Sequence, residues 1–145
     1  MTSVFPAIRD LARRILAIEG ARTNAGETPV DAAVRACAKL QVPLSQFMGC
    51  VGFYSLLSRA LGLAKKEVPA LQVVHVRPDG SLAGFDQIDR GQDAGEFENG
   101  RVALVAHLLN LLVTFIGASL ALRIACDGWP DASIDKMDLK EEDSP

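Results

Sequence analysis

Hydrophobic and polar positions near the N-terminus follow the period of a helix. Charged residues, Arg9 and Arg13 among them, fall between apolar positions spaced three or four apart. The apolar positions are Val4, Ile8, Leu11, Ile15 and Ile18. This pattern predicts an amphipathic helix over residues 6–19, with its apolar face toward a core and Gly20 at its end. A helix lying on a membrane surface is the alternative.

Residues 30–66 predict three further helices. Pro43 is expected to end the first, because proline lacks the backbone donor that a helix interior needs. Glycines weaken the remainder, which we divide into a short helix at 44–51 and a longer one at 52–66. The inward face of the longer helix is predicted to carry Phe53, Leu57, Ala60, Leu61 and Ala64.

The pattern changes near residues 72–85. A short β-branched run from Gln72 to Val76 precedes the turn sequence Arg77-Pro78-Asp79-Gly80. Proline suits the first central position of a turn, and glycine supplies a positive φ. We therefore predict a small β-hairpin, which must lie on the helices or pair with another chain, because a lone hairpin is barely stable in water.

The rest of the chain is organised around Arg101–Cys126, which predicts one long helix. No proline interrupts it, and no charge occurs between Arg101 and Arg123. A helix that is apolar nearly all round is buried, either in a core or in lipid. Residues 102–122 would span about 30 Å, which also matches a bilayer core. A soluble core helix is our first interpretation, and a single membrane span at 102–122 is the alternative.

Polar and small residues form one stripe along this helix. The stripe consists of His107, Asn110, Thr114, Gly117 and Ala121. Small residues allow another backbone to come close, and the polar ones offer it hydrogen bonds. The stripe could face a second helix of the same chain or the same helix of a second copy, so these five residues are the predicted interaction site. In the second case, Gly117→Leu should abolish association.

Length and charge bound the remaining possibilities. The chain has 145 residues, 49% hydrophobic and 23% charged, which predicts one globular domain over residues 1–130. Residues 131–145 are acidic, and we expect a mobile tail there. Residues 1–70 carry a net charge of +4 (nine basic, five acidic), and residues 71–145 carry −7 (six basic, thirteen acidic). No dense basic run with interleaved aromatics occurs, which argues against nucleic-acid binding.

Candidate chemistry is sparse. The three cysteines at 37, 50 and 126 form no C-x-x-C motif and indicate reduced, buried thiols in the cytoplasm. His107 on a buried helix could be catalytic or a metal ligand, but a hydrogen-bonded structural histidine is the favoured interpretation. Charges at Arg9 and Arg13 argue against a signal peptide. We predict no enzymatic activity, metal or cofactor, since no catalytic or phosphate-binding motif is present.

One resemblance adds to this picture. The run Leu111–Gly117, followed by Leu120-x-Leu122-Arg123 and Trp129-Pro130, resembles the C-terminal signature of a group of short, uncharacterised bacterial proteins. The similarity extends over residues 30–131 through Gly52-Phe53, Ser55-Leu56-Leu57 and Arg59-Ala60-Leu61. That group often carries an acid near position 118, where this chain has Ala118. The resemblance implies no activity.

The sequence therefore predicts a mainly α-helical domain with one small β-hairpin, built around the helix 101–126. Its predicted function is non-enzymatic contact with another protein, with a second copy of itself in a homodimer as the expected partner. A single-pass membrane protein is the first alternative. A small-molecule sensor with an apolar pocket near His107 is the second.

Overall fold

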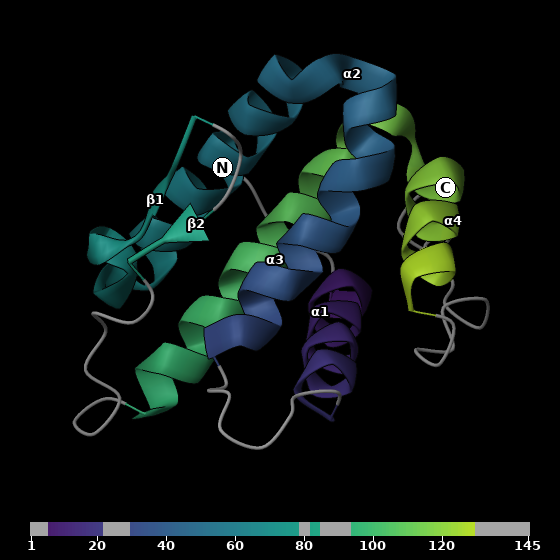
Figure 1. Cartoon of the computed structure of the whole chain (residues 1–145). Coiled ribbons are helices and arrows are strands. Elements are labelled where there is room, and N and C mark those ends of the chain that lie inside the picture. The colour runs from purple at the N-terminus through teal and green to yellow at the C-terminus, as the bar shows by residue number, and fades with distance from the viewer. Residues whose placement is uncertain (1–5, 22–29, 79–81, 85–93, 130–145) are drawn as a thin grey trace, which may run out of the picture.

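The computed structural model describes residues 6–21, 30–78, 82–84 and 94–129, and it confirms a mainly α-helical fold with one small hairpin (Figure 1). The elements in chain order are α1 (Pro6–Ala21), α2 (Val30–Glu67), the 3-10 helix η1 (Pro69–Val73), β1 (His75–Val76), β2 (Leu82–Ala83), α3 (Ala94–Ile116) and α4 (Ala118–Gly128).

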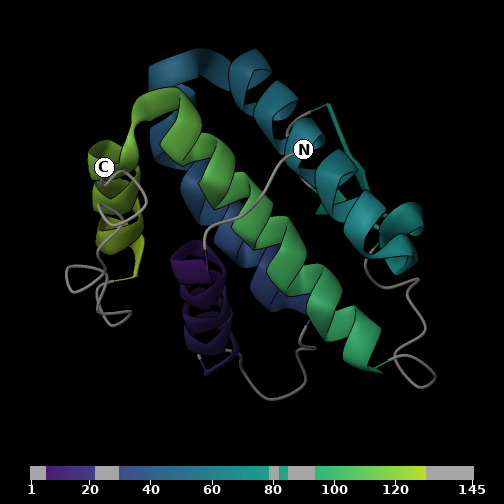
Figure 2. The same cartoon turned by 180° about the vertical axis from the view of Figure 1, so that it is seen from behind.

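Helix α2 bends over α3 and encloses it from two sides. Gly49 has φ 78° and ψ 169°, which no α-helix contains, so the helix turns sharply there. We call residues 30–48 the first arm, residues 50–67 the second arm, and the bend between them the elbow. Figures 1 and 2 show the first arm beside α3 and the second arm returning toward the hairpin.

The helix boundaries in this region correct the sequence analysis at two points. Pro43 does not end a helix but lies inside the first arm, which continues to the elbow. The division expected between 51 and 52 occurs instead at Gly49. The inward face of the second arm is as predicted, with Phe53, Leu57 and Ala60 fully buried.

Helix α3 supplies the centre of the core. Every side chain from Arg101 to Leu112 is buried, in agreement with a helix that is apolar on all sides. The predicted single helix at 101–126 is wrong at both ends: α3 begins at Ala94 and stops at Ile116. Gly117, with φ 90°, reverses the chain into α4. Residues 102–122 therefore do not form one continuous helix.

Helices α1 and α4 complete the bundle. The predicted apolar face of α1 is confirmed, since Ile8, Leu11 and Ile15 are fully buried. Helix α4 has a clear apolar side and packs against α3 and the first arm. Trp129, directly after α4, is also fully buried.

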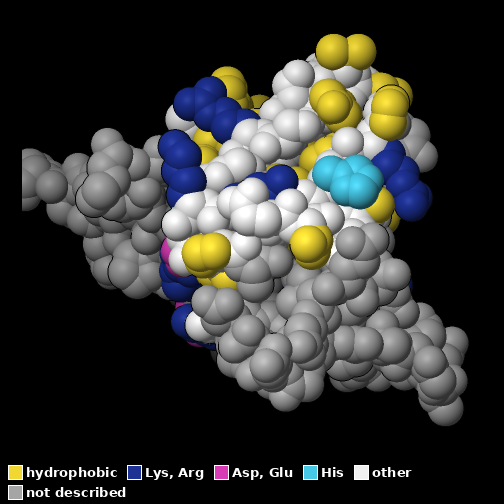
Figure 3. Space-filling view, turned by 90° about the vertical axis from the view of Figure 1, so that its left-hand side faces the viewer, with side chains coloured by type: hydrophobic (Ala, Val, Ile, Leu, Met, Phe, Trp, Pro, Cys, Tyr) yellow, Lys and Arg dark blue, Asp and Glu magenta, His cyan; other side chains and the backbone are white. Residues whose placement is uncertain are grey.

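The hairpin packs against α2. His75 pairs with Ala83 and Val76 with Leu82 in an antiparallel register. Leu82 is buried against the helices, so the hairpin gains the support that two short strands lack by themselves. Figure 3 shows the face that carries the hairpin, where basic side chains and separate apolar ones are visible and acidic ones appear only at one margin.

Two helical segments are long and apolar enough to cross a membrane. They are Arg35–Glu67 and Asn99–Ile116. The structure buries 33% of the most apolar 18-residue window in the first segment and 72% of that window in the second. Length and composition alone select them, and core helices of soluble proteins pass the same test. The predicted acidic tail at 131–145 lies outside the described residues.

Candidate functional site

The predicted stripe does not form one seam. His107, Asn110 and Ala121 are 4%, 7% and 2% exposed and face the chain's own core. Thr114 is exposed, and its hydroxyl donates to the Asn110 carbonyl oxygen at 3.0 Å. Gly117 is exposed between two helices that run in different directions. His107 and Asn110 therefore lie on the same helix, α3, whereas Ala121 belongs to α4.

His107 lies beside the last residue of α2. Its Nε2 atom is 3.0 Å from Oε1 of Glu67, whose carboxylate also pairs with Arg9 at 2.9 Å. Burial raises the pKa of Glu67, but the hydrogen bonds from Arg9 and His107 outweigh it and hold this pKa below its usual value. Nδ1 of His107 has no hydrogen-bond partner among the described residues. This cluster ties α1, α2 and α3 together, as a structural histidine would.

A second buried carboxylate ties α1 to the chain after α4. The Glu19 side chain is 1% exposed and lies 2.7 Å from Nζ of Lys39 and 3.3 Å from Nε of Arg35. The indole Nε1 of Trp129 donates to its Oε2 at 2.8 Å. Burial by itself raises the pKa of Glu19. The hydrogen bonds from Lys39 and Trp129 lower it by more than burial raises it, so this pKa lies below its usual value. Lys39 also lies 5.6 Å from the centre of the Trp129 ring, a favourable cation–π distance.

Lys39 and Trp129 of the second cluster also line a pocket of about 350 Å³, together with Asp127 of α4. Among the described residues, no three His, Cys, Asp or Glu side chains lie close enough together to hold a metal ion. All three cysteines are free, and burial raises the pKa of Cys37 to about 12, which leaves its thiol unreactive. The sequence analysis expected buried thiols, but Cys50 is exposed at the elbow.

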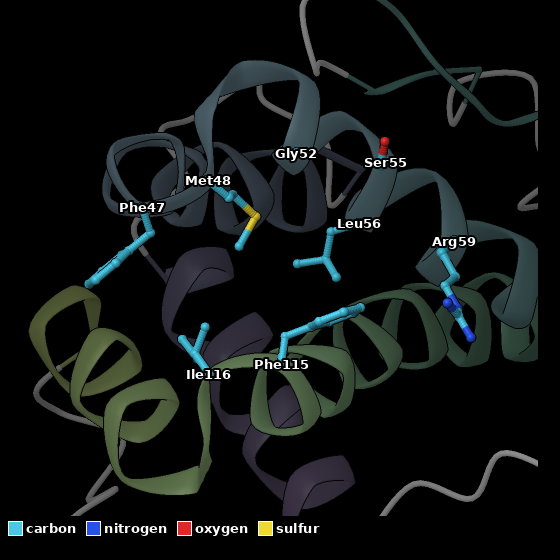
Figure 4. Close-up of a pocket in the computed structure, with 8 residues that line it drawn as sticks. All are labelled: Phe47, Met48, Gly52, Ser55, Leu56, Arg59, Phe115 and Ile116. Carbon is cyan, nitrogen blue, oxygen red and sulfur yellow. The ribbon is translucent and has the colours of Figure 1, made fainter.

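Among the described residues, one concave feature lies where the elbow meets the end of α3. A groove of about 610 Å³ is lined by Phe47, Met48, Gly52, Ser55, Leu56, Arg59, Phe115 and Ile116. Met48, Leu56, Phe115 and Ile116 converge on the hollow in Figure 4, from α2 on one side and α3 on the other. We call this feature the elbow groove. It is an apolar pocket, but His107 does not line it, so it is not where the sequence analysis expected one.

Two positive-φ glycines create the elbow groove. Gly49 bends α2 across the end of α3, and Gly117 turns the chain away from the line of α3. A side chain larger than glycine rarely adopts a positive φ, so both bends depend on these residues. The last turn of α3 is therefore only partly covered: Val113 and Ile116 are half-buried, and Phe115 is 60% exposed.

Large exposed apolar side chains also lie on α2 close to the elbow. Val42, Phe47 and Val51 are 66%, 59% and 80% exposed, and we call these three residues the elbow surface. Single exposed apolar residues are ordinary, but three large ones on one short segment beside an apolar groove indicate a contact site. Phe47 belongs to both features, since it also lines the edge of the groove.

Comparisons with known proteins add no relative: no family model matches the chain, and neither the curated proteins nor the solved structures contain a match. The resemblance to a group of short bacterial proteins therefore stays a prediction. Any functional conclusion rests on the residues of this chain alone.

Sequence reasoning missed the elbow groove and the elbow surface. Phe47 and Val51 lie in a stretch whose apolar residues looked like ordinary core positions. The signal that could have found them is the glycine at 49, since a break there divides the helix and changes which side chains face inward. Phe115 could not have been singled out, because a helix that is apolar all round shows no distinct exposed face.

Proposed function

We propose that this protein acts without catalysis, by contacting another protein, and that it self-associates through the elbow surface. The observation that carries the proposal is the exposure of Val42, Phe47 and Val51 on one segment of α2. Large apolar side chains exposed to water cost free energy, and a partner that covers them recovers it. This places the contact on α2 instead of on the stripe of the sequence analysis.

A second copy of the chain is the partner that we propose first. In a two-fold dimer, the elbow surface of each copy would cover the elbow surface of the other. In such an interface the same patch serves on both subunits. Charge supports the proposal in a lesser way, because no acidic residue occurs between Asp31 and Glu67 that would oppose burial of the elbow.

The test is the mass of the protein in solution, purified without detergent. Size-exclusion chromatography with light scattering should give twice the 15.5 kDa chain mass for the wild type. Val51→Glu should give a folded monomer, because a charge buried in an apolar interface is strongly unfavourable. Val73→Glu is the matched control, since Val73 is an exposed valine on η1, away from the elbow.

Three results would count against this function. A wild-type monomer at all accessible concentrations would remove self-association. Equal loss of the dimer in Val51→Glu and Val73→Glu would place the interface elsewhere. Recovery only from the membrane pellet with detergent would favour the membrane alternative, in which the apolar surface of α2 contacts lipid.

A further inference from the structure

The elbow groove has the size of a small-molecule site. Its volume of about 610 Å³ lies within the range of roughly 300–1,000 Å³ that is usual for ligand pockets. A single flexible alkyl chain can lie within a hollow of this size.

The walls of the groove suit an alkyl chain. Met48 and Leu56 on α2 face Phe115 and Ile116 on α3 across the hollow (Figure 4). Methionine adapts its shape to irregular apolar surfaces, and the Phe115 ring, which is 60% exposed, has a broad face to cover. A bound alkyl chain would therefore remove apolar surface of the protein as well as its own from water.

One end of the groove is charged. Among the described residues that line it, Arg59 alone is charged, and Figure 4 shows its guanidinium at the end beyond the Phe115 ring. No acidic residue occurs at 32–66 or 99–126, the stretches that supply both walls. Among the described residues, no ion pair joins Arg59. Within these two stretches, no carboxylate is available to this cation.

We propose that the elbow groove binds a single-chain amphiphile with a carboxylate head, such as a medium-chain fatty acid. The carboxylate pairs with the Arg59 guanidinium, whose planar fork matches a carboxylate in two parallel hydrogen bonds. The alkyl chain lies along Leu56, Phe115 and Met48. This ligand goes beyond the self-association proposed above, and the residues that carry it differ from Val51, which does not line the groove.

Two ligands that differ only in their heads test the role of Arg59. Isothermal titration with decanoate, below its micelle-forming concentration, should show saturable binding at one site per chain. Decan-1-ol should bind more weakly, because it lacks the charge. Arg59→Glu should weaken decanoate binding tenfold or more and leave decan-1-ol within about twofold. Arg123→Glu, at an exposed arginine of α4, should leave both unchanged.

Chain length tests the apolar walls. Each added methylene group from hexanoate to decanoate should tighten binding about fourfold. Phe115→Ser should weaken decanoate and decan-1-ol alike, with circular dichroism confirming that the variant is folded. A chain-length series with no trend would overturn the assignment of the alkyl chain to the groove.

The remaining outcomes separate this ligand from other occupants. Absence of saturable decanoate binding in the wild type and in Val51→Glu would overturn the proposal without affecting self-association. Binding in Val51→Glu but not in the wild-type dimer would show that a second copy fills the groove, which also overturns it. Binding to phosphatidylglycerol vesicles without binding to decanoate would assign the surface to a membrane. Equal losses from Arg59→Glu and Arg123→Glu would exclude a specific carboxylate contact.

Discussion

From Arg101 to Leu112, α3 is enclosed on every side, whereas its last turn, from Val113 to Ile116, borders the elbow groove. Residues 101–112 are rich in Leu and Val, the last turn consists of Val113, Thr114, Phe115 and Ile116, and neither part contains a charge after Arg101. Their surroundings differ because the two arms of α2 and the helix α1 cover the first part, while the elbow and Gly117 direct the chain away from the second.

This difference shows that the composition of a helix does not determine how much of it is covered. A helix with apolar residues all round can be buried over its full length or left open at one end. The outcome depends on where its neighbours bend. In this chain both bends are at glycines with positive φ, so two positions decide whether the end of α3 is core or surface.

The largest expected effect separates the two parts of α3 directly. Leu108→Ala should lower the free energy of unfolding by about 3 kcal/mol, because Leu108 is fully buried and the cavity cannot collapse completely. Phe115→Ala removes a larger side chain but should cost less than about 1 kcal/mol, since Phe115 is 60% exposed. Urea denaturation followed by circular dichroism measures both.

Similar losses for the two variants would contradict this comparison. They would mean that the end of α3 is covered in solution, as it would be in a tight dimer. Repeating the measurement in the Val51→Glu background distinguishes the two cases, because a monomer should again show the difference.

The next effect concerns the buried carboxylate of Glu19, which contacts Arg35, Lys39 and Trp129. Glu19→Gln should cost about 2–3 kcal/mol at neutral pH, because Lys39 and Arg35 lose their counter-charge beside a side chain that is 1% exposed. Asp10→Asn is the control: its ion pair with Arg14 is exposed and should contribute less than about 0.5 kcal/mol.

Acid should remove the same stabilisation. The pKa of Glu19 is lower in the folded state than its usual value of 4.5, so the unfolded chain takes up the proton first as the pH falls. The stabilisation is complete above pH 4.5 and is lost as the pH falls through the lower, folded-state value. Urea midpoints measured between pH 7 and pH 2 should therefore fall less steeply for Glu19→Gln than for the wild type. Parallel profiles would contradict the assignment.

Much of the fold could be predicted from the sequence, for reasons that the structure makes clear. The apolar periodicity of residues 8–15 and the turn chemistry at Pro78 are local signals, and each correctly indicated its element. Trp129 follows helix α4 and is fully buried. Its partner Glu19 could not be foreseen, since 110 residues separate them and no local pattern joins them.

The elbow groove could not be predicted because it depends on two bends acting together. Gly49 is one of the glycines expected to weaken this helix, but a helix can tolerate a glycine. Only the φ of 78° at Gly49 shows that the helix is broken there. Pro43 carried the stronger local signal and was misleading, since the surrounding contacts keep it inside the helix. Arg59 gains significance only when α2 and α3 are placed side by side.

The smallest effects distinguish these glycines from one another. Gly49→Ala and Gly117→Ala should each destabilise the protein by about 1 kcal/mol, because an alanine at φ 78° or 90° is strained even though no atom blocks its Cβ. Gly62→Ala should have the opposite sign and stabilise by about 0.5–1 kcal/mol, since Gly62 is exposed inside the second arm, also with open space at its Cβ. Urea midpoints decide between them. If Gly49→Ala were also stabilising, the two arms would form a straight helix in solution, and both the elbow surface and the elbow groove would be lost.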